Sequence, residues 1–149
     1  MFRHKTVLVV DDEPGPRQAL QMILKRRYNV LTCDDPQKAM ELVSSGEVDV
    51  VMLDIKMPGM DGLELLKVMK QSATDVEIAL ITGYPSMQSA IEAMQQGAYD
   101  YVIKPFDKDR VEQVVRQGVI RRSQRKVEKD FSSHLISEVF NKFSQKKPS

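Results

Sequence analysis

The sequence predicts an α/β fold in which five parallel strands form a doubly wound sheet with helices on both faces. Five short apolar runs alternate with segments whose apolar residues have helical spacing, a pattern typical of strands joined by right-handed helical crossovers. The runs are apolar throughout, as expected for parallel strands buried on both faces. Four of these runs are followed or ended by polar or charged residues, at Asp11-Asp12, Asp54, Thr82 and Lys104-Pro105.

In the first half of the chain, the expected elements are two strands and two helices. The strands are predicted over residues 6–10 and 29–33, the second as a short edge strand. Pro14-Gly15-Pro16 opens the first helix, because proline is tolerated in a first turn, and its apolar residues share one face to about residue 26. Asp34-Asp35-Pro36 caps a second helix that Gly46 ends.

The second half continues the alternation. Strands are predicted over residues 49–53, 77–81 and 99–103. A loop of turn-forming residues, Met57-Pro58-Gly59-Met60-Asp61-Gly62, precedes a helix over residues 63–71. Ser86 caps the fourth helix and Gly97 ends it, while Asp107 caps a long final helical region.

Composition is that of an ordinary globular domain. The 149 residues suit one domain with a real core, at 42% hydrophobic and 29% charged content. The single Cys33 excludes an intramolecular disulfide and a thiolate metal cluster, which fits a reducing compartment. No apolar run approaches 18 residues and Met1–Lys5 offers no signal peptide, so we expect a cytoplasmic protein without a membrane segment.

Charge is unevenly distributed along the chain. Residues 1–106 carry 11 Lys/Arg and 15 Asp/Glu, whereas residues 107–149 carry 11 and 6. A basic tail can be a nucleic-acid arm. Because the basic residues are interleaved with acids, we interpret the tail as a solvated helix face, and we expect no direct nucleic-acid binding by this chain.

The polar run ends predict a ligand site, because the carboxyl ends of parallel strands meet at one edge of an open α/β sheet. Asp11, Asp12 and Asp54 would place carboxylate oxygens there, and Mg²⁺ prefers a few carboxylates together with water and phosphate oxygens. The alternative is structural: the acidic pair caps the following helix, and Asp54 begins the turn after its strand.

Thr82 and Lys104 add the groups that a phosphoryl ligand needs. The Thr82 hydroxyl can hydrogen-bond a phosphoryl oxygen, with Gly83 allowing close approach of the backbone. The Lys104 ammonium can neutralise phosphoryl charge or pair with Asp54. Each residue alone is common at a strand end, but together with the three acids they indicate a phosphorylation switch.

These residues carry a family resemblance. The chain resembles the receiver domain of bacterial two-component response regulators, which has an acidic pair after its first strand, an Asp before Met-Pro-Gly-x-Asp-Gly, a Thr after its fourth strand and Lys-Pro after its fifth. The resemblance predicts a receiver domain over residues 1–122 and a helical tail or linker over residues 123–149. Ala98–Tyr101 and Pro105-Phe106 are most similar to receivers of the nitrogen-regulator type, which precede ATPase domains; this chain contains no Walker motif.

The resemblance implies a flavodoxin-like sheet of strand order 2-1-3-4-5 in which Asp54 accepts a phosphoryl group from a sensor histidine kinase. Asp12, Asp54 and the backbone carbonyl of Lys56 would hold Mg²⁺, with Asp11 acting through water. Such a domain promotes only its own phosphorylation and dephosphorylation and is not an enzyme acting on an outside substrate.

The resemblance also assigns the phosphoryl contacts and the switch. Thr82 and Lys104 would bind the phosphoryl oxygens, and the Lys104–Pro105 bond would be cis. Tyr101 would be the switch aromatic, turning inward as Thr82 moves toward the phosphoryl group and changing the surface formed by the fourth helix and fifth strand.

The tail departs from the family pattern. A receiver's last helix should end near Arg122, yet helix-favouring sequence continues, without a sustained apolar heptad for a coiled coil. Apolar residues between Phe131 and Phe143 predict a separate short amphipathic helix capped by Ser132 or Ser133. It must cover its apolar face on the domain, on a partner or membrane surface, or in a homodimer, which could also form through the fourth helix, fifth strand and fifth helix.

Three other functions fit parts of the pattern. A phosphohydrolase of the dehalogenase type also uses a strand-end Asp with Mg²⁺, but it needs a second Asp where this chain has Lys56. A receiver-like protein-interaction module without phosphorylation is the main alternative, although every position that phosphorylation needs is filled. A DNA-binding output is disfavoured, because the residues after the receiver are too few and lack a helix-turn-helix pattern.

Overall fold

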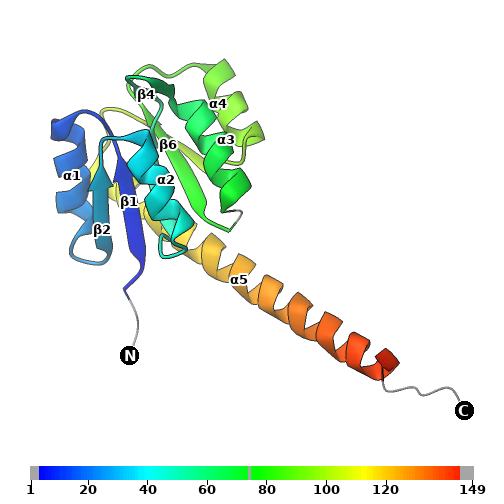
Figure 1. Cartoon of the computed structure of the whole chain (residues 1–149). Coiled ribbons are helices and arrows are strands. Elements are labelled where there is room, and N and C mark those ends of the chain that lie inside the picture. The colour runs from blue at the N-terminus through cyan, green and yellow to red at the C-terminus, as the bar shows by residue number, and fades with distance from the viewer. Residues whose placement is uncertain (1–3, 74, 145–149) are drawn as a thin grey trace, which may run out of the picture.

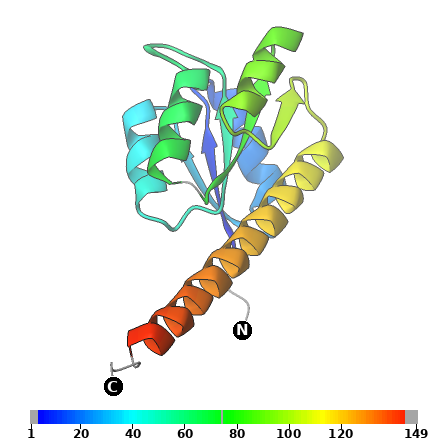
Figure 2. The same ribbon diagram turned by 90° about the vertical axis from the view of Figure 1, so that its right-hand side faces the viewer.

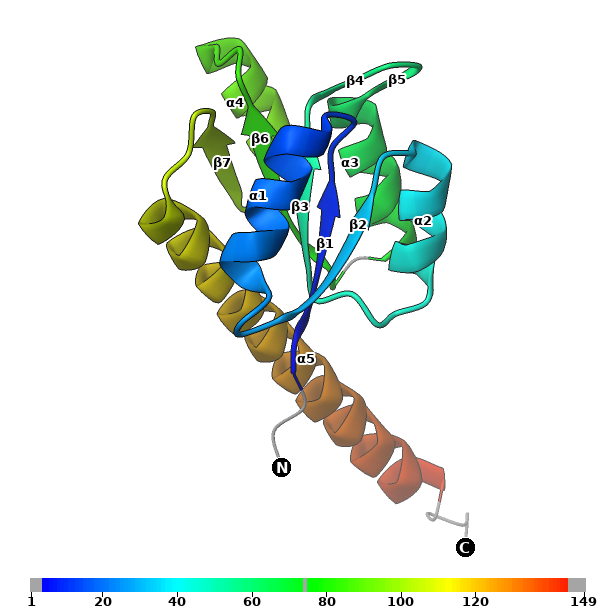
Figure 3. The same ribbon diagram turned by 90° about the vertical axis from the view of Figure 1, so that its left-hand side faces the viewer.

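Five parallel strands form the central sheet of the computed structural model, which describes residues 4–73 and 75–144 (Figures 1 and 3). Their spatial order is β2-β1-β3-β6-β7, the predicted 2-1-3-4-5 order of the five main strands. The strands are β1 (Thr6–Val10), β2 (Asn29–Cys33), β3 (Val50–Asp54), β6 (Glu77–Thr82) and β7 (Asp100–Ile103). The helices are α1 (Pro14–Leu24), α2 (Pro36–Ser44), α3 (Gly62–Ser72), α4 (Met87–Gln95) and α5 (Lys108–Ser144).

The predicted caps are confirmed where α2, α4 and α5 begin. The side chains of Asp35 and Ser86 accept hydrogen bonds from backbone N–H groups in the first turns of α2 and α4. Asp107 accepts one from the N–H of Arg110 at 2.7 Å. Gly46 and Gly97 adopt the positive φ that favours glycine at helix ends, so both predicted stops are also confirmed.

A small hairpin was not predicted. Strands β4 (Lys56–Met57) and β5 (Met60–Asp61) pair antiparallel across the Pro58-Gly59 turn. Gly62 follows, and a Cβ there would lie 2.5 Å from the Cα of Ile55, so only glycine fits. The hairpin therefore holds the loop after Asp54 tightly against the end of β3.

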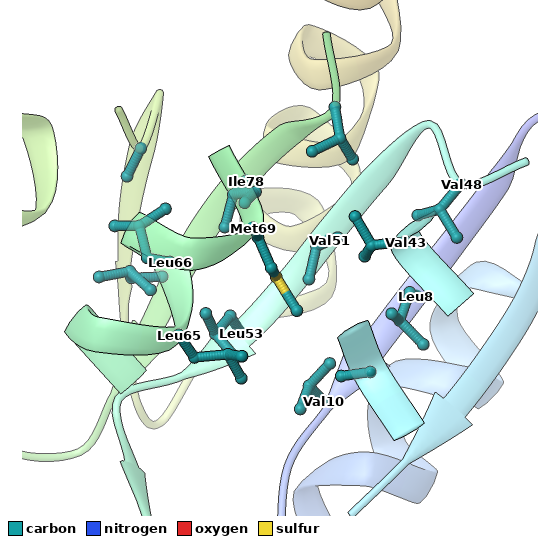
Figure 4. Close-up of a cluster of buried hydrophobic side chains, with 14 of the residues drawn as sticks. Leu8, Val10, Val43, Val48, Val51, Leu53, Leu65, Leu66, Met69 and Ile78 are labelled. Carbon is teal, nitrogen blue, oxygen red and sulfur yellow. The ribbon is translucent and has the colours of Figure 1, made fainter. Parts of the chain in front are cut away.

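The sheet has two apolar layers, one on each face. Figure 4 shows Val51 and Ile78 beside Met69 of α3, and Leu8 beside Val43 of α2. The intervening strand residues point to the opposite face, where the core includes residues of α1 and α5. This alternation confirms the prediction of helices on both faces, and it leaves the strand ends as the places where polar side chains gather.

The prediction of two C-terminal helices is wrong, because α5 is one continuous helix of 37 residues (Figure 2). It neither ends near Arg122 nor restarts at Ser132 or Ser133. Between Gly118 and Ser144 there is no glycine or proline to stop it, and the segment is rich in good helix formers. Gly118 itself is required by packing, because a Cβ there would lie 2.4 Å from the Tyr99 hydroxyl oxygen.

The continuous helix crosses the predicted boundary at residue 122, so the division into residues 1–122 and 123–149 stays a prediction. Residues 145–149 of the predicted tail, and residues 1–3 of the expected leaderless start, lie outside the described residues. Among the helices that the structure describes, none is long and apolar enough to cross a membrane.

Candidate functional site at the carboxyl edge of the sheet

Four carboxylates meet at the carboxyl edge. Asp11, Asp12 and Glu13 follow β1, and Asp54 ends β3, the neighbouring parallel strand. Each offers an oxygen atom, and these four atoms all lie within 4.8 Å of one another. Asp11 is 1% exposed and Asp54 is 3% exposed, so two of the charges are almost completely withdrawn from water. The structure thus brings the three predicted acids together.

Glu13 is the member of this cluster that the sequence interpretation missed. Its signal was present, as the third acid of an uninterrupted run after β1. Only the pair Asp11-Asp12 of this run is predicted from the sequence to lie in the site. In the fold, the turn from β1 into α1 carries Glu13 back toward Asp54.

Lys104 reaches the cluster from the loop after β7. Its Nζ atom lies 3.1 Å from Oδ2 of Asp11 and 3.5 Å from Oδ2 of Asp54. The predicted pairing with Asp54 is confirmed, and the closer partner is Asp11. The Lys104–Pro105 bond is cis, as the resemblance implied. Among the described side chains, Lys104 makes both of the ion pairs that these four acids have.

Local turns and the site share the same carboxylates. Oδ1 of Asp11 accepts a hydrogen bond from the N–H of Glu13 at 2.9 Å, and Oδ1 of Asp54 accepts one from the N–H of Lys56 at 3.3 Å. In both residues Oδ2 is the oxygen that faces Lys104. The structural role in a turn and the role in a ligand site are therefore compatible, because Oδ1 of each aspartate serves the turn and Oδ2 faces the site. The Glu13 side chain, at the N-cap of α1, makes no capping hydrogen bond.

Burial and charge change the proton affinity of the central groups. Burial and the charge of Asp11 raise the pKa of Asp54 from 3.8 to about 6, although Lys104 opposes the shift. For Lys104, burial alone lowers the pKa, but the hydrogen bond to Asp11 and the acidic charges outweigh it, so the pKa is raised. The ammonium therefore stays charged, and the carboxylates remain under mutual repulsion that one lysine does not relieve.

The donor set fits a hard divalent cation. Oδ1 of Asp12 is buried and has no hydrogen-bond partner among the described residues, which is costly for an acceptor unless a ligand occupies it. Clustered carboxylate oxygens are the ligands that Mg²⁺ prefers. Lys56 starts β4 with its backbone beside Asp54, while its ammonium stacks 3.9 Å above the ring centre of Tyr84. The ligand role of its carbonyl stays a prediction.

Thr82 and Tyr101 occupy the two strands beyond β3. Thr82, 2% exposed, ends β6, and its hydroxyl accepts a hydrogen bond from the N–H of Tyr84 at 3.0 Å. In the described residues no hydrogen bond joins this hydroxyl to the acids. Tyr101 is half-buried on β7, and its hydroxyl lies 2.9 Å from Oγ of Ser89 on α4. The Ser89 contact was not predicted, because nothing in the sequence pairs residues 12 positions apart on different elements.

Comparison with known proteins agrees with this geometry. The sequence model of the family described as "Response regulator receiver domain" matches residues 7–116. The chain belongs to this family. As a receiver, it is 36% identical over 121 residues to the regulatory protein AtoC of Escherichia coli K12, and 38% identical over 116 residues to the DNA-binding transcriptional regulator NtrC of the same strain. These matches take in 80% and 76% of this chain.

The receiver spans only about a quarter of those two relatives, 26% of AtoC and 24% of NtrC. It matches 66% of the transcriptional regulatory protein FixJ of Bradyrhizobium diazoefficiens, at 32% identity over 88% of this chain. The resemblance to nitrogen-regulator receivers stated from the sequence is thus confirmed, since NtrC is among the relatives.

Solved structures agree on the fold. NtrX from Brucella abortus, in complex with ADP, has a TM-score of 0.80 at 29% identity, covering 87% of this chain and 30% of that one. The signal receiver domain of an HD domain-containing protein from Pseudomonas fluorescens Pf-5 has a TM-score of 0.79, also at 29% identity, covering 85% of this chain and 94% of that one. The flavodoxin-like receiver fold predicted from sequence is confirmed.

Proposed function

We propose that this receiver is a phosphorylation-activated switch in which Asp54 accepts a phosphoryl group from a sensor histidine kinase. The observation that carries the proposal is the placement of the Asp54 carboxylate, buried within a four-acid cluster and 3.5 Å from the Lys104 ammonium. A carboxylate is a workable acceptor when cations surround it, because phosphoryl transfer depends mainly on positioning and charge neutralisation. With a pKa of about 6, Asp54 is ionised and nucleophilic at neutral pH.

Each neighbouring group has a role in this proposal. Asp12, Asp54 and the backbone carbonyl of Lys56 hold Mg²⁺, with Asp11 acting through water. The ion, when bound, supplies positive charge against the phosphoryl oxygens. Lys104 supplies a second cation, which already contacts Asp54.

The switch uses two hydroxyl groups that have other partners in this structure. Thr82 exchanges the N–H of Tyr84 for a phosphoryl oxygen, and Tyr101 leaves Ser89 as it turns inward. Both movements change the surface of α4 and β7, where Met87 is 81% exposed and Ile103 is 50% exposed. That surface then controls a partner or effector, or supports a homodimer, in the cytoplasm. The chain promotes only its own phosphorylation and hydrolysis.

The alternative is an interaction module that keeps the receiver fold without phosphorylation. It would retain its partner when Asp54 is altered, whereas the switch would lose its signal. The dehalogenase-type reaction is not proposed, because the position two residues after Asp54 holds Lys56, whose ammonium stacks on Tyr84.

Incubation with acetyl phosphate and Mg²⁺, followed by intact-mass measurement, tests the proposal. Wild type should gain one acid-labile phosphoryl group, and Asp54→Asn should gain none while keeping its fold. Asp61→Asn is the matched control: Asp61 lies in the same loop and caps α3, and asparagine caps equally well. Phosphorylation of Asp54→Asn at the wild-type rate would place the acceptor elsewhere, and an unreactive wild type would favour the interaction module.

A further inference from the structure

The last nineteen described residues of α5, 126–144, project from the receiver body, and we refer to them as the free segment. Figures 1 and 2 show this end of the helix projecting beyond the sheet and the other helices. Every residue from 126 to 144 is exposed. Its first residues still border the body, because Lys126, Val127 and Asp130 share a hollow with Glu47 and Asp49. The apolar side chains from Leu135 to Phe143 line a separate hollow formed by α5 alone.

The free segment exposes an apolar surface to water, which is unfavourable for an isolated helix. Its large apolar side chains are between 47% and 71% exposed: Val127, Phe131, Leu135, Ile136, Val139, Phe140 and Phe143. Together they expose on the order of 800 Å², more than the largest apolar patch of a typical monomeric protein. A helix of this length is also marginal without tertiary packing. Both facts indicate that another polypeptide segment, the occupant, packs against the apolar face of the free segment.

The side chains form a ridge and a groove. Phe131, Leu135, Val139 and Phe143 are spaced strictly four apart, so they form one continuous ridge along the helix. Ile136 and Phe140 begin a second ridge beside it. The groove between the two ridges is lined by Leu135, Ile136, Val139, Phe140 and Phe143. Ridges of this spacing pack into the grooves of an equivalent helix at an inclined crossing.

We propose that the occupant is the free segment of a second copy of this chain, bound antiparallel through the ridge and groove. The ridge order Phe-Leu-Val-Phe is nearly the same in both directions, so a twofold axis near Ser137 places Phe131 against the partner copy's equivalent of position 143, and Leu135 against that of position 139. The interface is thereby self-complementary.

Charge favours the antiparallel arrangement. Residues 121–130 carry five Lys/Arg and two Asp/Glu, and a parallel pair would set these two basic segments side by side. An antiparallel pair moves them to opposite ends of the contact. A supercoiled seam, which alternates steps of three and four, cannot run through Phe131 and Leu135, because the residues three after them are His134 and Glu138, which pair with each other at 3.2 Å.

The chain's own body is excluded as the occupant because ion pairs fix the direction of α5. Arg121 and Arg125 both bind the buried Glu77 at the start of β6, at 3.2 and 2.9 Å. Arg122 binds Asp49 just before β3. Held at three points in two turns, the helix cannot fold its apolar face back onto the sheet. Residues 145–149, Gln-Lys-Lys-Pro-Ser, contain no large apolar side chain that could fill the groove.

Sedimentation equilibrium of the full, unphosphorylated chain over a range of concentrations tests the proposal. Wild type should show a monomer–dimer equilibrium, and Leu135→Glu/Val139→Glu, which charges the centre of the ridge, should raise the dissociation constant by about 100-fold. The matched control Ser133→Glu/Ser137→Glu adds the same charges to the polar face and should change it less than about threefold. Far-UV circular dichroism checks that each variant retains the fold.

A wild type that stays monomeric would overturn the proposal and leave a different protein, or a segment outside this sequence, as the occupant. A ridge variant that dimerises like wild type would also overturn it, by placing the dimer on another face. Both outcomes leave the proposed phosphorylation of Asp54 untouched, because the chain is unphosphorylated throughout.

Cross-linking with a short bismaleimide tests the orientation, in a Cys33→Ala background. Ser132→Cys chains should not link to one another, because the two positions lie about 15 Å apart along an antiparallel pair. A mixture of Ser132→Cys and Ser144→Cys chains should give the linked heterodimer, because these positions lie on the same flank of the antiparallel pair and about 3 Å apart along it. Efficient linking of Ser132→Cys to itself would contradict the antiparallel arrangement.

Discussion

Carboxylates cluster at both edges of the sheet, but the two clusters differ in how many cationic side chains pair with them. At the carboxyl edge, four acids have one ammonium, Lys104, within ion-pair distance. At the amino edge, three acids are matched by three guanidinium groups from α5. The pairs there are Glu77 with Arg121 and Arg125, and Asp49 and Asp75 with Arg122.

The contrast indicates which acidic cluster is suited to a cationic ligand. Asp49 and Asp54 lie at opposite ends of β3, and both are nearly buried. Asp49 accepts a hydrogen bond from the N–H of Thr6 and pairs with Arg122, so its charge is satisfied within the protein. Asp54 shares one lysine with Asp11, and its pKa rises. The acids at the carboxyl edge therefore keep negative charge that the protein does not neutralise, as a cation site requires. The acids at the amino edge are neutralised by arginines and hold α5 to the body.

The largest effect should come from removing compensation at the amino edge. Arg121→Met/Arg125→Met should lower the free energy of unfolding by about 3 kcal/mol, because it leaves the fully buried Glu77 without two of its cationic partners. Urea unfolding measures this loss. Arg116→Met, on an exposed part of the same helix, should change the free energy by less than about 0.5 kcal/mol. Equal effects of the two variants would mean that the ion pairs at Glu77 do not hold α5.

A second pair of variants should have opposite signs at the two ends of β3. In a chelator at pH 7, Asp54→Asn should raise the free energy of unfolding by about 2 kcal/mol, because it removes a carboxylate whose pKa is raised from 3.8 to about 6. Asp49→Asn should lower it by about 1 kcal/mol through loss of the Arg122 ion pair. Effects of the same sign would remove the distinction between the edges.

The pH dependence of Asp54 follows from the direction of its shift. The folded state binds the proton more tightly than the unfolded state, so wild type should lose stability as the pH rises from about 4 to about 6. Above about pH 7 the penalty is complete and the difference between wild type and Asp54→Asn should be constant. Thermal unfolding in chelator at several pH values measures this. A wild-type advantage that grows with pH in this window would contradict the raised pKa.

Much of the fold and of the carboxyl edge could be predicted because their signals are local. Apolar runs with polar ends place Asp54, Thr82 and Lys104 at one edge as soon as the strands are parallel. The amino edge could not be predicted, since Arg122 is 73 residues from Asp49 and neither is unusual in its own surroundings. The continuity of α5 was missed for a related reason: the three arginines that hold it to the body had no visible partners.

A smaller effect on the free energy of unfolding is expected from substitution of Asp12, at the carboxyl edge. Asp12→Ala should raise the free energy of unfolding in chelator by about 1 kcal/mol, because it relieves repulsion within the four-acid cluster. It should also abolish most of the rise in Tm that Mg²⁺ gives wild type. Differential scanning calorimetry with and without Mg²⁺ measures both. Glu64→Ala, on an exposed residue beside the cluster, should keep the Mg²⁺ response; a destabilised Asp12→Ala in chelator would make Asp12 structural.

The smallest effect concerns coupling between the site and the free segment of α5. Arg110, in the first turns of α5, pairs with Asp100 at 2.9 Å and donates to the carbonyl of Tyr101 at 3.4 Å. We expect a movement of Tyr101 on phosphorylation to reach α5 through this backbone contact. Because this is one contact far from the ridge, we expect phosphorylation by acetyl phosphate to change the dimer dissociation constant by only about fivefold.

A chain ending after Asp130 separates this coupling from the phosphorylation itself. It keeps Arg121, Arg122 and Arg125, so α5 stays held to the body, but it lacks the ridge that begins at Phe131. Sedimentation of both chains, with and without acetyl phosphate, should show phosphorylation-dependent association only for the full chain, while Asp54 gains its phosphoryl group at the same rate in both. If the full chain associates equally in both states, the ridge is a constitutive contact, and the output of the switch lies on α4 and β7 alone.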